Sequence, residues 1–513
     1  MTIKSINPAT LEVNAEIEPS PVDSVKNIVD SARDAQILWG GLSLNKRLQH
    51  LNKVKDCLIS NIDEVAKVIT LDNGKPLVEA INSEIYPVLD MFRFCANDAA
   101  EALRSERVNN PIFRIARVRS YNLFEPRGVA GIISPWNFPF SIPVTQILMA
   151  LVGGNAVVFK PSVLTALVGE QIRKLFEEGG MPEGVVNVVQ GSGSEIGDVM
   201  MDAGFDHVIF TGSIAVGKHL MKKAADTLTP ITLELGGKDP FIVFSDADVE
   251  RASSAAVWGA FINAGQVCAS VERVYVDRRV VEDFTSAVVE KTKKLRLGDG
   301  IDPDTDMGPL ISEERIGVVE AHINDAVSKG ARILTGGKRI TDLPGFFFEP
   351  TVIADANHTM DCMMEETFGP TLPIMVFDDI DEAVELANDT RYGLNASIWT
   401  ANIKKAEGIS RRLRAGTVIV NNCLFTYGFS QCPWGGVKES GIGRTHSVHG
   451  LHELTNIKNV TINTPLIRED LWWYPYTENK YKALKGALKA MFGGRMIRSA
   501  EGIVEIIKSF RLY

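Results

Sequence analysis

The spacing of apolar residues along the chain changes near residue 129. Between about residues 20 and 110, apolar and charged residues alternate at helical spacing, as in DSVKNIVDSARDAQ at 23–36, which predicts amphipathic helices. From residue 129 onward, short β-branched runs that end at Gly- or Pro-containing turns alternate with helical stretches. Four such strand–helix pairs follow one another: 129–135 with 142–151, 155–162 with 165–179, 185–191 with 194–204, and 207–213 with 215–226. This pattern predicts a parallel, doubly wound sheet with helices on both faces.

A second α/β pattern begins after residue 236. The segment 113–124, FRIARVRSYNLF, looks like a strand pair inserted before the first strand–helix pair, either as an arm for oligomerisation or as a surface hairpin. Because a single hydrophobic core stops growing at about 250–300 residues, the 513 residues indicate two large domains. The strands predicted for the second domain lie at 241–244, 273–276, 373–377, 396–400 and 418–421.

The chain beyond about residue 465 has a different character. The aromatic segment 472–476, WWYPY, precedes a stretch whose apolar residues share one helical face, with lysines on the other faces. Residues 466–513 carry nine Lys or Arg and five Asp or Glu, a net charge of +4. We expect this tail to pack on the protein's own surface or on a neighbouring subunit, with the lysine-bearing helix outside. A basic amphipathic helix that contacts a membrane surface is the alternative.

Composition and charge narrow the class of protein. Hydrophobic residues make up 45% of the chain and charged residues 23%, as in ordinary globular proteins. The net charge of −10 disfavours a nucleic-acid partner, because such proteins usually present a basic face. The first residues, MTIKSINPAT, lack the apolar run of a signal peptide, and no stretch reaches the roughly 18 apolar residues of a membrane span. Six cysteines without a CxxC pair predict no disulfide framework, so we expect a cytoplasmic location.

Three residues are candidates for chemistry. Cys268 follows a flexible Gly265-Gln266 approach at a predicted helix-to-strand junction. Because the thiolate is the reactive form, we expect this site to lower the pKa of the thiol. Glu234 ends an apolar strand before a Gly-Gly break, where partial desolvation raises a carboxyl pKa toward the range of a general base. Asn137 lies between two prolines that fix its loop, and a rigid amide beside a nucleophile is a good donor to an oxyanion.

Other chemistries fit the sequence less well. A cysteine hydrolase needs a histidine base, but the nearest histidines, His219 and His322, lie about fifty residues from Cys268 on either side. The three histidines in 446–452 are spaced by three without a fourth ligand, so we interpret them as one helical face and expect no metal site.

Three segments are candidates for nucleotide binding. Gly191 opens the segment GSGSEIG, which is similar to a dinucleotide fingerprint but has a different last spacing. The segment 212–217, GSIAVG, follows a predicted strand and opens a helix, where backbone N–H groups favour a phosphate. Lys160 ends another predicted strand, at the carboxyl edge where nucleotides bind in open parallel sheets.

Taken together, these segments resemble the aldehyde dehydrogenase superfamily from residue 6 to about residue 465. Cys268 lies 34 positions after Glu234, which is the spacing of the family's active-site pair. The resemblance implies that Cys268 attacks an aldehyde and that the Asn137 amide and the Cys268 N–H hold the oxyanion. It also implies that Glu234 activates the water that hydrolyses the resulting thioester. The matching segments, in family order, are PWNFP (135–139), GNAVVFKPS (154–162), FTGS with VG (210–217), LELGGKDP (233–240), GQVC (265–268), EETFGP (365–370), YGLNASIWT (392–400) and PWGGVKESGIGR (433–444).

The resemblance further implies a site for NAD or NADP. Lys160 matches the lysine that binds the adenosine ribose, and Ser213 matches the serine under the pyrophosphate. Glu366 matches the carboxylate on the nicotinamide ribose, with Phe368 beside that ring. Val163 stands where the family often has a glutamate that binds the ribose hydroxyls, so the preference between the two coenzymes stays open. The expected coenzyme-binding residues are Ser134, Pro135, Trp136, Lys160, Ser162, Gly191, Gly212, Ser213, Gly217, Leu235, Gly236, Glu366 and Phe368.

The substrate is predicted from the loop around Trp434, which replaces the family's usual phenylalanine. We expect Phe138, Tyr427, Phe429 and Trp434 to line the aldehyde pocket, which favours an apolar or aromatic aldehyde. The absence of arginine in 415–440 disfavours a dicarboxylic semialdehyde. Succinic semialdehyde stays the alternative, because the whole chain also resembles bacterial succinic-semialdehyde dehydrogenases. An acylating enzyme that uses coenzyme A, or a non-catalytic relative, fits less well because the catalytic residues are intact.

The resemblance also implies an aldehyde dehydrogenase-like α/β fold: two doubly wound α/β domains, a small β oligomerisation arm and a helical C-terminal tail. Family members commonly form dimers or tetramers by pairing their arms, so we expect a homodimer or homotetramer that takes a small-molecule aldehyde. The expected boundaries are 1–107 with 126–236 for the coenzyme-binding domain, 237–445 for the catalytic domain, 108–125 with 446–465 for the arm, and 466–513 for the tail.

Overall fold

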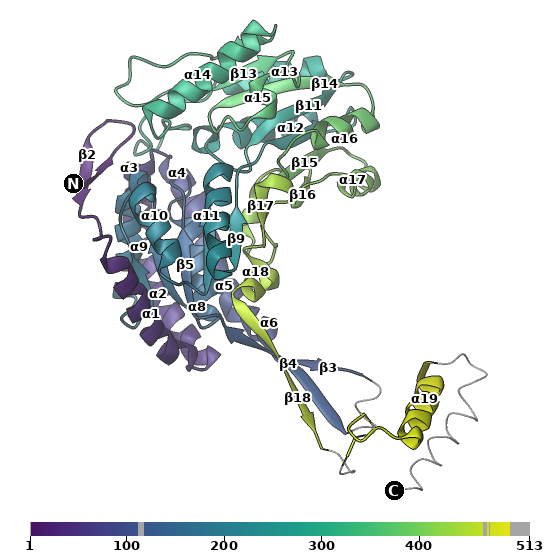
Figure 1. Ribbon diagram of the computed structural model, residues 1–513. Coiled ribbons are helices and arrows are strands. Elements are labelled where there is room, and N and C mark those ends of the chain that lie inside the picture. Colours follow the sequence, from purple (N-terminus) through teal and green to yellow (C-terminus); the bar gives the residue numbers. More distant parts are fainter. Residues whose placement is uncertain (1, 111–116, 465–468, 471, 493–513) are drawn as a thin grey trace. The chain divides into compact units, whose positions relative to one another are not determined.

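The computed structural model describes residues 2–110, 117–464, 469–470 and 472–492 (Figure 1). The chain divides into two compact units. The larger unit comprises residues 1–104 and 124–457, and the smaller one comprises residues 105–123 and the chain from 458 onward. Each is described by itself below.

Helices dominate the first part of the larger unit, as the sequence predicts. In one of them, Leu51, Val54 and Leu58 recur every three or four residues and are buried, so this helix turns its apolar face to the core. The elements are the hairpin β1 (Ile3–Ile6) and β2 (Val13–Ile17), then α1 (Ser24–Gly40), α2 (Leu44–Ser60), α3 (Ile62–Asn73), α4 (Leu77–Glu79), the π-helix η1 (Ala80–Ile85), α5 (Tyr86–Asn97) and α6 (Ala99–Ala102).

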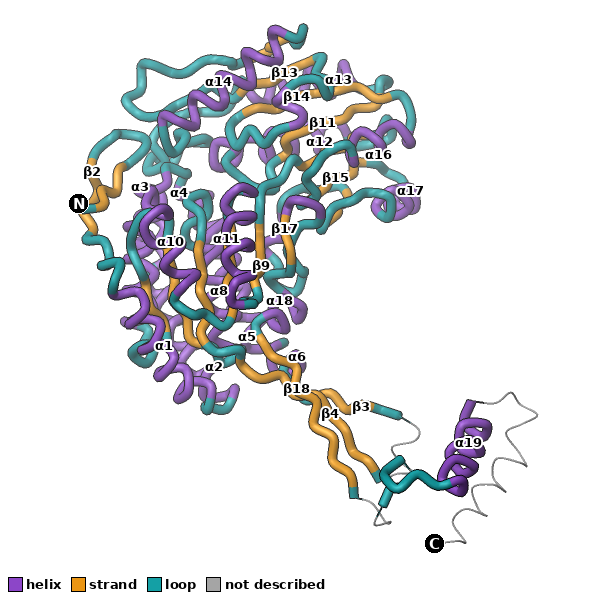
Figure 2. The backbone as a smooth tube through the Cα atoms, viewed as in Figure 1, coloured by secondary structure: helices purple, strands orange, loops and turns teal. Residues whose placement is uncertain are grey.

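The strands of all four predicted strand–helix pairs belong to one six-stranded sheet (Figure 2). Each strand is followed by its predicted helix, so the four pairs are confirmed. Its order, β17-β9-β8-β5-β6-β7, places the first parallel strand, β5, in the middle, so the chain winds to both sides of it. Helices α1, α10 and α11 pack on one face, and α5, α8 and α9 pack on the other. The elements are β5 (Val129–Ile133), α8 (Ser141–Val152), β6 (Ala156–Lys160), η2 (Val163–Thr165), α9 (Ala166–Glu178), β7 (Val186–Val188), α10 (Gly193–Asp202), β8 (His207–Thr211), α11 (Ile214–Thr227), β9 (Ile231–Glu234) and the antiparallel β17 (Gly441–Ile442).

A seven-stranded sheet, in the order β12-β13-β14-β11-β10-β15-β16, forms the second layered region of the same unit. The five strands predicted after residue 236 all belong to it, whereas β12 and β13 were not predicted. Only β12 runs antiparallel to its neighbour. The elements are β10 (Asp239–Val243), α12 (Val249–Phe261), η3 (Ile262–Gly265), β11 (Val271–Asp277), α13 (Val281–Thr292), α14 (Glu313–Ser328), β12 (Arg332–Thr335), β13 (Thr351–Ala354), α15 (Asp361–Met364), β14 (Thr371–Phe377), α16 (Ile380–Asn388), β15 (Asn395–Trp399), α17 (Ile403–Ser410), β16 (Thr417–Val420), η4 (Phe425–Gly428), η5 (Lys438–Ser440) and α18 (Ser447–Glu453).

Three antiparallel strands form a small separate sheet: β3 (Glu106–Val108), β4 (Val118–Pro126) and β18 (Thr455–Asn463). The prediction of a strand pair within 113–124 was wrong for its described part, because 118–124 lie in the single strand β4. The partners of β4 come from 106–108 and from 455–463, a pairing distant in sequence that local alternation cannot reveal. The remainder of the predicted segment, up to residue 116, lies outside the described residues.

The described part of the tail contains the helix α19 (Glu478–Phe492). Trp472 and Tyr474 are 59% and 77% exposed, whereas Lys480 is 4% exposed and donates to the carbonyl oxygen of Trp473 at 2.9 Å. The expectation that these aromatic residues pack on the protein's own surface or on a neighbouring subunit stays a prediction. Among the described residues, no helix is both long and apolar enough to cross a membrane.

Candidate active site

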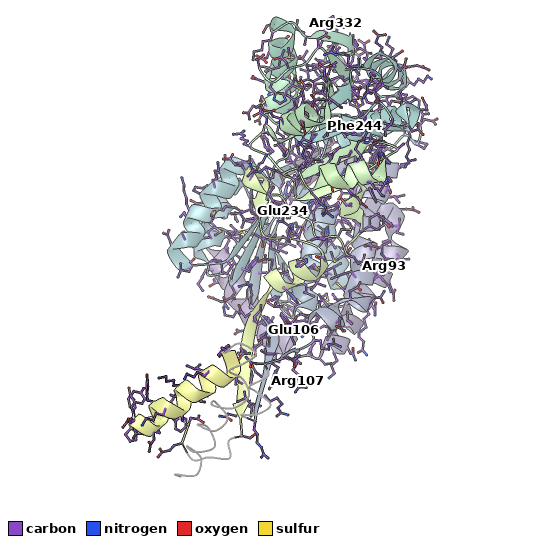
Figure 3. All side chains as sticks on the ribbon, turned by 90° about the vertical axis from the view of Figure 1, so that its right-hand side faces the viewer. Arg93, Glu106, Arg107, Glu234, Phe244 and Arg332 are labelled. Carbon is purple, nitrogen blue, oxygen red and sulfur yellow. The ribbon has the colours of Figure 1, made fainter. Side chains whose placement is uncertain are left out.

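A cavity of about 290 Å³ in the larger unit has the predicted nucleophile and the predicted base on its wall. Cys268 and Glu234 both line it. Glu234 is the last residue of β9, and the next strand, β10, already belongs to the other sheet. Glu234 therefore lies where the chain passes from one sheet to the other (Figure 3).

The backbone before Cys268 is tightly constrained. Helix α12 ends in η3, in which Asn263 and Ala264 have φ of 50° and 54° and Gly265 has φ of 74°. The Gln266 side chain closes this turn, because its Nε2 donates to the Asn263 carbonyl oxygen at 2.9 Å. Its Oε1 accepts from a backbone N–H of the neighbouring segment 307–311 at 2.9 Å. The half-buried thiol is thus presented by a rigid turn immediately before β11.

The surroundings of Cys268 do not lower the pKa of its thiol. Burial raises this pKa, and the nearby carboxylates of Glu366, Asp239 and Glu234 raise it further. The expectation of a lowered pKa was therefore wrong for the protein alone, because no described cation compensates for desolvation of the thiolate. A nucleophile in this environment needs a base that removes its proton.

Glu234 has the properties of such a base. Its side chain is 4% exposed, and neither carboxylate oxygen has a hydrogen-bond partner among the described residues. Burial raises its pKa to about 8, although the charge of Arg444 opposes this shift. Gly435 faces the carboxylate, and a Cβ there would lie 3.0 Å from Glu234 Oε1. The elevated pKa agrees with the prediction from the sequence, and the unpaired oxygens leave the carboxylate able to bind water.

Asn137 lies beside the nucleophile segment. Its Nδ2 donates one hydrogen to the Gln266 carbonyl oxygen at 3.0 Å, two residues before Cys268. An amide carries two N–H bonds, so the second stays available for an oxyanion. The Asn137 carbonyl oxygen accepts from Lys75 Nζ at 2.8 Å and from Asn263 Nδ2 at 2.9 Å. The amide is consequently held to the same turn that presents the thiol.

The residues predicted to bind the coenzyme gather at the carboxyl ends of neighbouring strands of the six-stranded sheet. The chain winds in opposite directions from β5 and β8, and nucleotides bind at such a switch point in open parallel sheets. The positions are Ser134, Pro135 and Trp136 after β5, Lys160 and Ser162 at the end of β6, Gly191 after β7, Gly212 and Ser213 after β8, Gly217 in α11, and Leu235 and Gly236 after β9.

These residues fit a dinucleotide. Ser213 caps α11, where free backbone N–H groups and the helix dipole favour a phosphate. Gly212 tolerates no side chain, because a Cβ there would collide with the Phe210 ring. Lys160 is buried, and among the described residues its Nζ donates only to the Pro161 carbonyl oxygen, at 3.1 Å. Burial lowers the pKa of Lys160 to about 8, and a bound hydroxyl or phosphate would offset this desolvation.

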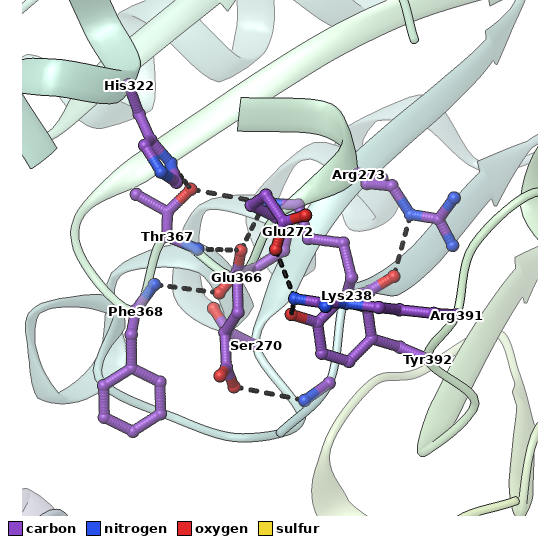
Figure 4. A network of polar contacts seen from close by, with 12 residues as sticks. Lys238, Ser270, Glu272, Arg273, His322, Glu366, Thr367, Phe368, Arg391 and Tyr392 are labelled. Atoms are coloured by element: carbon purple, nitrogen blue, oxygen red, sulfur yellow. Dashed lines mark hydrogen bonds and ion pairs between the residues drawn. The ribbon is translucent and has the colours of Figure 1, made fainter. Parts of the chain in front are cut away.

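The loop 365–369 brings Glu366 and Phe368 to the same region (Figure 4). Glu366 Oε1 accepts from the Gly237 backbone N–H at 3.1 Å, three residues after Glu234. Phe368 has φ of 51° and meets the Trp136 ring edge-on, with the ring centroids 5.4 Å apart. Burial raises the pKa of Glu366 to about 8. Two segments predicted to bind the coenzyme, far apart in sequence, are therefore in contact.

The four residues predicted for the substrate pocket all line the cavity. Sequence reasoning missed several others, which come from helices without a motif, such as Tyr86 and Trp258, and from motif segments to which a different role was given, such as Thr211. Among the described residues of its wall, Glu234 is the one ionisable carboxylate, and no Lys, Arg or His is present. Phe138, Tyr427, Phe429 and Trp434 are joined by residues that were not predicted for the pocket: Asn82, Ser83, Tyr86, Pro87, Ile142, Gln146, Thr211, Leu235, Trp258, Ile262, Val267, Ala269, Leu424, Phe425, Gly428 and Thr445.

Comparisons with known proteins identify the family of the chain and agree with its fold. Residues 1–460 match a family model described as the aldehyde dehydrogenase family. A 4,4'-diapolycopene aldehyde oxidase of a Methylomonas species is 38% identical over 99% of this chain and 95% of its own length. The probable NADP(+) succinate-semialdehyde dehydrogenase of Sinorhizobium fredii is 39% identical over 89% of this chain and 92% of its own. The crystal structure of betaine aldehyde dehydrogenase from Staphylococcus aureus in complex with NAD+ has a TM-score of 0.86 at 36% identity, and covers 92% of this chain and 94% of its own.

Proposed function

The chain belongs to the aldehyde dehydrogenase family, a family of NAD(P)-dependent oxidoreductases. From that membership we propose that it oxidises an apolar aldehyde to the carboxylic acid, with Cys268 as the nucleophile and Glu234 as the base. The observation that supports this most directly is that both side chains line one cavity whose wall is otherwise uncharged. The predicted coenzyme-binding residues lie on the adjoining segments.

In the first half of the reaction, the Cys268 thiol gives up its proton to a base, and its sulfur bonds to the aldehyde carbon. Glu234 is suited to take that proton because its pKa is about 8. The carbonyl oxygen becomes an oxyanion, which the free N–H of the Asn137 amide and the Cys268 backbone N–H stabilise. The nicotinamide ring of bound NAD or NADP supplies the acceptor for the hydride that leaves this carbon. A thioester on Cys268 remains.

In the second half, water adds to the thioester carbon, the C–S bond breaks and the acid leaves. Glu234 takes the proton of the attacking water, since its oxygens are unpaired and face the cavity. The thiolate of Cys268 is regenerated and regains a proton. One base that serves both halves must release its proton to solvent between them.

The cavity supports an apolar substrate. A dicarboxylic semialdehyde would need a cation for its second carboxylate, and the described wall offers none. Tyr86, Trp258 and Phe425 line the cavity and are 40–45% exposed, so apolar surface continues from its interior to its mouth. We infer that the body of the aldehyde is long enough to lie against these three rings, and succinic semialdehyde becomes the second candidate.

The tail supports a proposal about where such a substrate is met. The relative named for the aldehyde of diapolycopene, an apolar polyene, matches 99% of this chain, whereas the relative named for succinate semialdehyde matches 89%. We infer that the exposed aromatic residues at 472–476 and the lysines of α19 contact an anionic lipid surface, where an apolar aldehyde dissolves. We also propose that the sheet of β3, β4 and β18 pairs with another copy of the chain, as a homodimer or homotetramer.

The proposal is tested with Cys268→Ala and a panel of aldehydes. The variant is expected to lose NAD(P)H formation and to keep coenzyme binding, because the thiol forms the covalent bond but holds no phosphate. In the intact enzyme, straight-chain aldehydes assayed with NAD and with NADP should gain up to about fourfold in kcat/KM per buried methylene, the equivalent of about 0.8 kcal/mol. Turnover by the variant would contradict the proposed mechanism. A higher kcat/KM for succinic semialdehyde than for the straight-chain aldehydes would contradict the assignment of an apolar substrate.

A further inference from the structure

Two buried lysine–glutamate pairs flank the groups that react, and neither pair lines the cavity. The first joins Lys238 to Glu272, with side chains 0% and 4% exposed (Figure 4). Lys238 lies four residues after Glu234, and Glu272 lies four residues after Cys268. The pair therefore links the segment that follows the base to the segment that follows the nucleophile.

The carboxylate of Glu272 also holds the loop 365–369. It accepts the backbone N–H of Thr367 at 2.8 Å and that of Phe368 at 3.1 Å. Lys238 Nζ donates to Thr367 Oγ1 at 3.2 Å. These bonds fix the backbone on which Glu366 and Phe368 stand, including the left-handed conformation of Phe368.

The second pair, Lys75 with Glu84 at 2.6 Å, has both side chains fully buried. Glu84 Oε2 accepts the backbone N–H of Phe140 at 3.1 Å and that of Ser141 at 2.7 Å, at the start of α8. Lys75 Nζ donates to the Asn137 carbonyl oxygen at 2.8 Å. This pair thus holds the loop that carries the proposed oxyanion donor, as the first pair holds the loop that carries the proposed ribose ligand.

Stability alone is a weak reason for such pairs. Removing two charges from water costs several kcal/mol per ion, and well-packed apolar residues often replace a buried pair without loss of stability. What an apolar pair cannot do is accept backbone N–H groups of a loop. The function of each pair therefore lies in the geometry of the loop that it holds.

We propose that the two pairs position different halves of the site. The Lys238–Glu272 pair sets the loop of Glu366 and Phe368 for the coenzyme, and the Lys75–Glu84 pair sets Asn137 for the oxyanion. The assignment rests on the proposed function, because it takes the roles of these loops from it. All four are positioning residues, and disturbing one pair should change one kinetic step and spare the other.

The test compares Glu272→Gln with Glu84→Gln in the full-length enzyme. Glu272→Gln is expected to raise the Kd and the KM of the coenzyme about tenfold, and to leave the rate of NAD(P)H formation at saturating coenzyme within about threefold. Glu84→Gln is expected to lower that single-turnover rate by about tenfold to a hundredfold and to leave the coenzyme Kd unchanged. Each variant is the matched control of the other, since both replace one buried glutamate that accepts two loop N–H groups.

Two further measurements keep the outcome decisive. The double variant Lys238→Met with Glu272→Leu leaves no unpaired charge, so it should fold and still show the raised coenzyme Kd. The Kd, measured by quenching of protein fluorescence without aldehyde, requires no catalysis, so it is independent of whether Cys268 is the nucleophile. Equal losses in both readouts for Glu272→Gln and Glu84→Gln, or an unchanged Kd in the double variant, would overturn the proposal.

Discussion

At the scale of single residues, the proposed chemistry depends on two acids whose pKa values are both raised. Burial makes the thiol of Cys268 and the carboxyl of Glu234 reluctant to ionise, so neither is reactive by itself at neutral pH. Proton transfer from the thiol to the ionised carboxylate of Glu234 moves one negative charge from the carboxylate to the sulfur, and this keeps the net charge of the cavity constant. Which of the two groups carries the proton can therefore depend on what binds beside them.

Glu234→Gln is expected to slow the first hydride transfer, because the Cys268 thiol loses its base, and to slow turnover still more, because water is a much weaker acid than a thiol and thioester hydrolysis depends more strongly on the base. Rapid mixing should show a burst of NAD(P)H followed by slow turnover. In the intact enzyme the base must be ionised, so kcat should rise with pH with a midpoint near the Glu234 pKa of about 8, and this rise should disappear in the variant. Wild-type turnover in Glu234→Gln would assign the base elsewhere.

The residues proposed to react could be identified from the sequence, because their spacing and their neighbouring glycines are local features. Cys268 and Glu234 could be singled out by motif, but the direction of the Cys268 pKa shift could not. That shift depends on Asp239 and Glu366, whose charges approach only in the folded chain. The buried partners Lys238 and Glu272 were missed for the same reason, since a charged residue normally indicates exposure, both in a loop, as for Lys238, and in a strand, as for Glu272.

At the scale of elements, strands and helices that alternate along the chain were predicted, and those that pair over long distances were not. The strands β5, β6, β7 and β8 are each followed by the helix that covers them. Each strand–helix pair therefore lies within one continuous stretch of sequence, where its pattern can be recognised. The strand β18 is mostly exposed along its length, and its partner β4 lies more than 300 residues earlier. A mostly exposed strand lacks the alternation of apolar and polar residues by which strands are recognised, and a partner so distant in sequence leaves no local signal.

The turn η3 supports a prediction at this scale. Gly265→Ala places a methyl group against the Gly369 carbonyl group and 2.9 Å from the Ala260 carbonyl oxygen, at a φ of 74°. It should destabilise the fold by about 1–3 kcal/mol and lower the single-turnover rate, since Cys268 follows three residues later. Gly408→Ala in α17 is the control, because nothing lies within 4 Å of its added methyl group. Equal melting temperatures and equal single-turnover rates for the two variants, measured by melting curves and stopped flow, would contradict the role proposed for this turn.

At the scale of the whole molecule, the tail differs in charge from the rest of the enzyme. The chain carries a net charge of −10, which by itself repels an anionic membrane. In α19, Lys482, Lys485 and Lys489 are exposed, and of these three Lys482 pairs with a carboxylate, Glu478 at 2.9 Å, whereas the buried Lys480 pairs with Glu469 at 3.8 Å. Each lysine near an anionic surface contributes about 1 kcal/mol, and exposed aromatic rings add burial in the headgroup region.

Truncation after Thr464 is therefore expected to abolish co-sedimentation with anionic vesicles and to leave kcat for a short, water-soluble aldehyde within about twofold, because no described residue beyond 445 lines the cavity. The full-length enzyme should oxidise a long-chain aldehyde carried in vesicles faster than the truncated one. The full-length variant Trp472→Ser with Trp473→Ser tests the aromatic contribution without shortening the chain. Light scattering and melting curves complete the comparison: if truncation dissociates the oligomer and the intact protein ignores vesicles, the tail packs on a partner subunit, and the lipid contact is wrong.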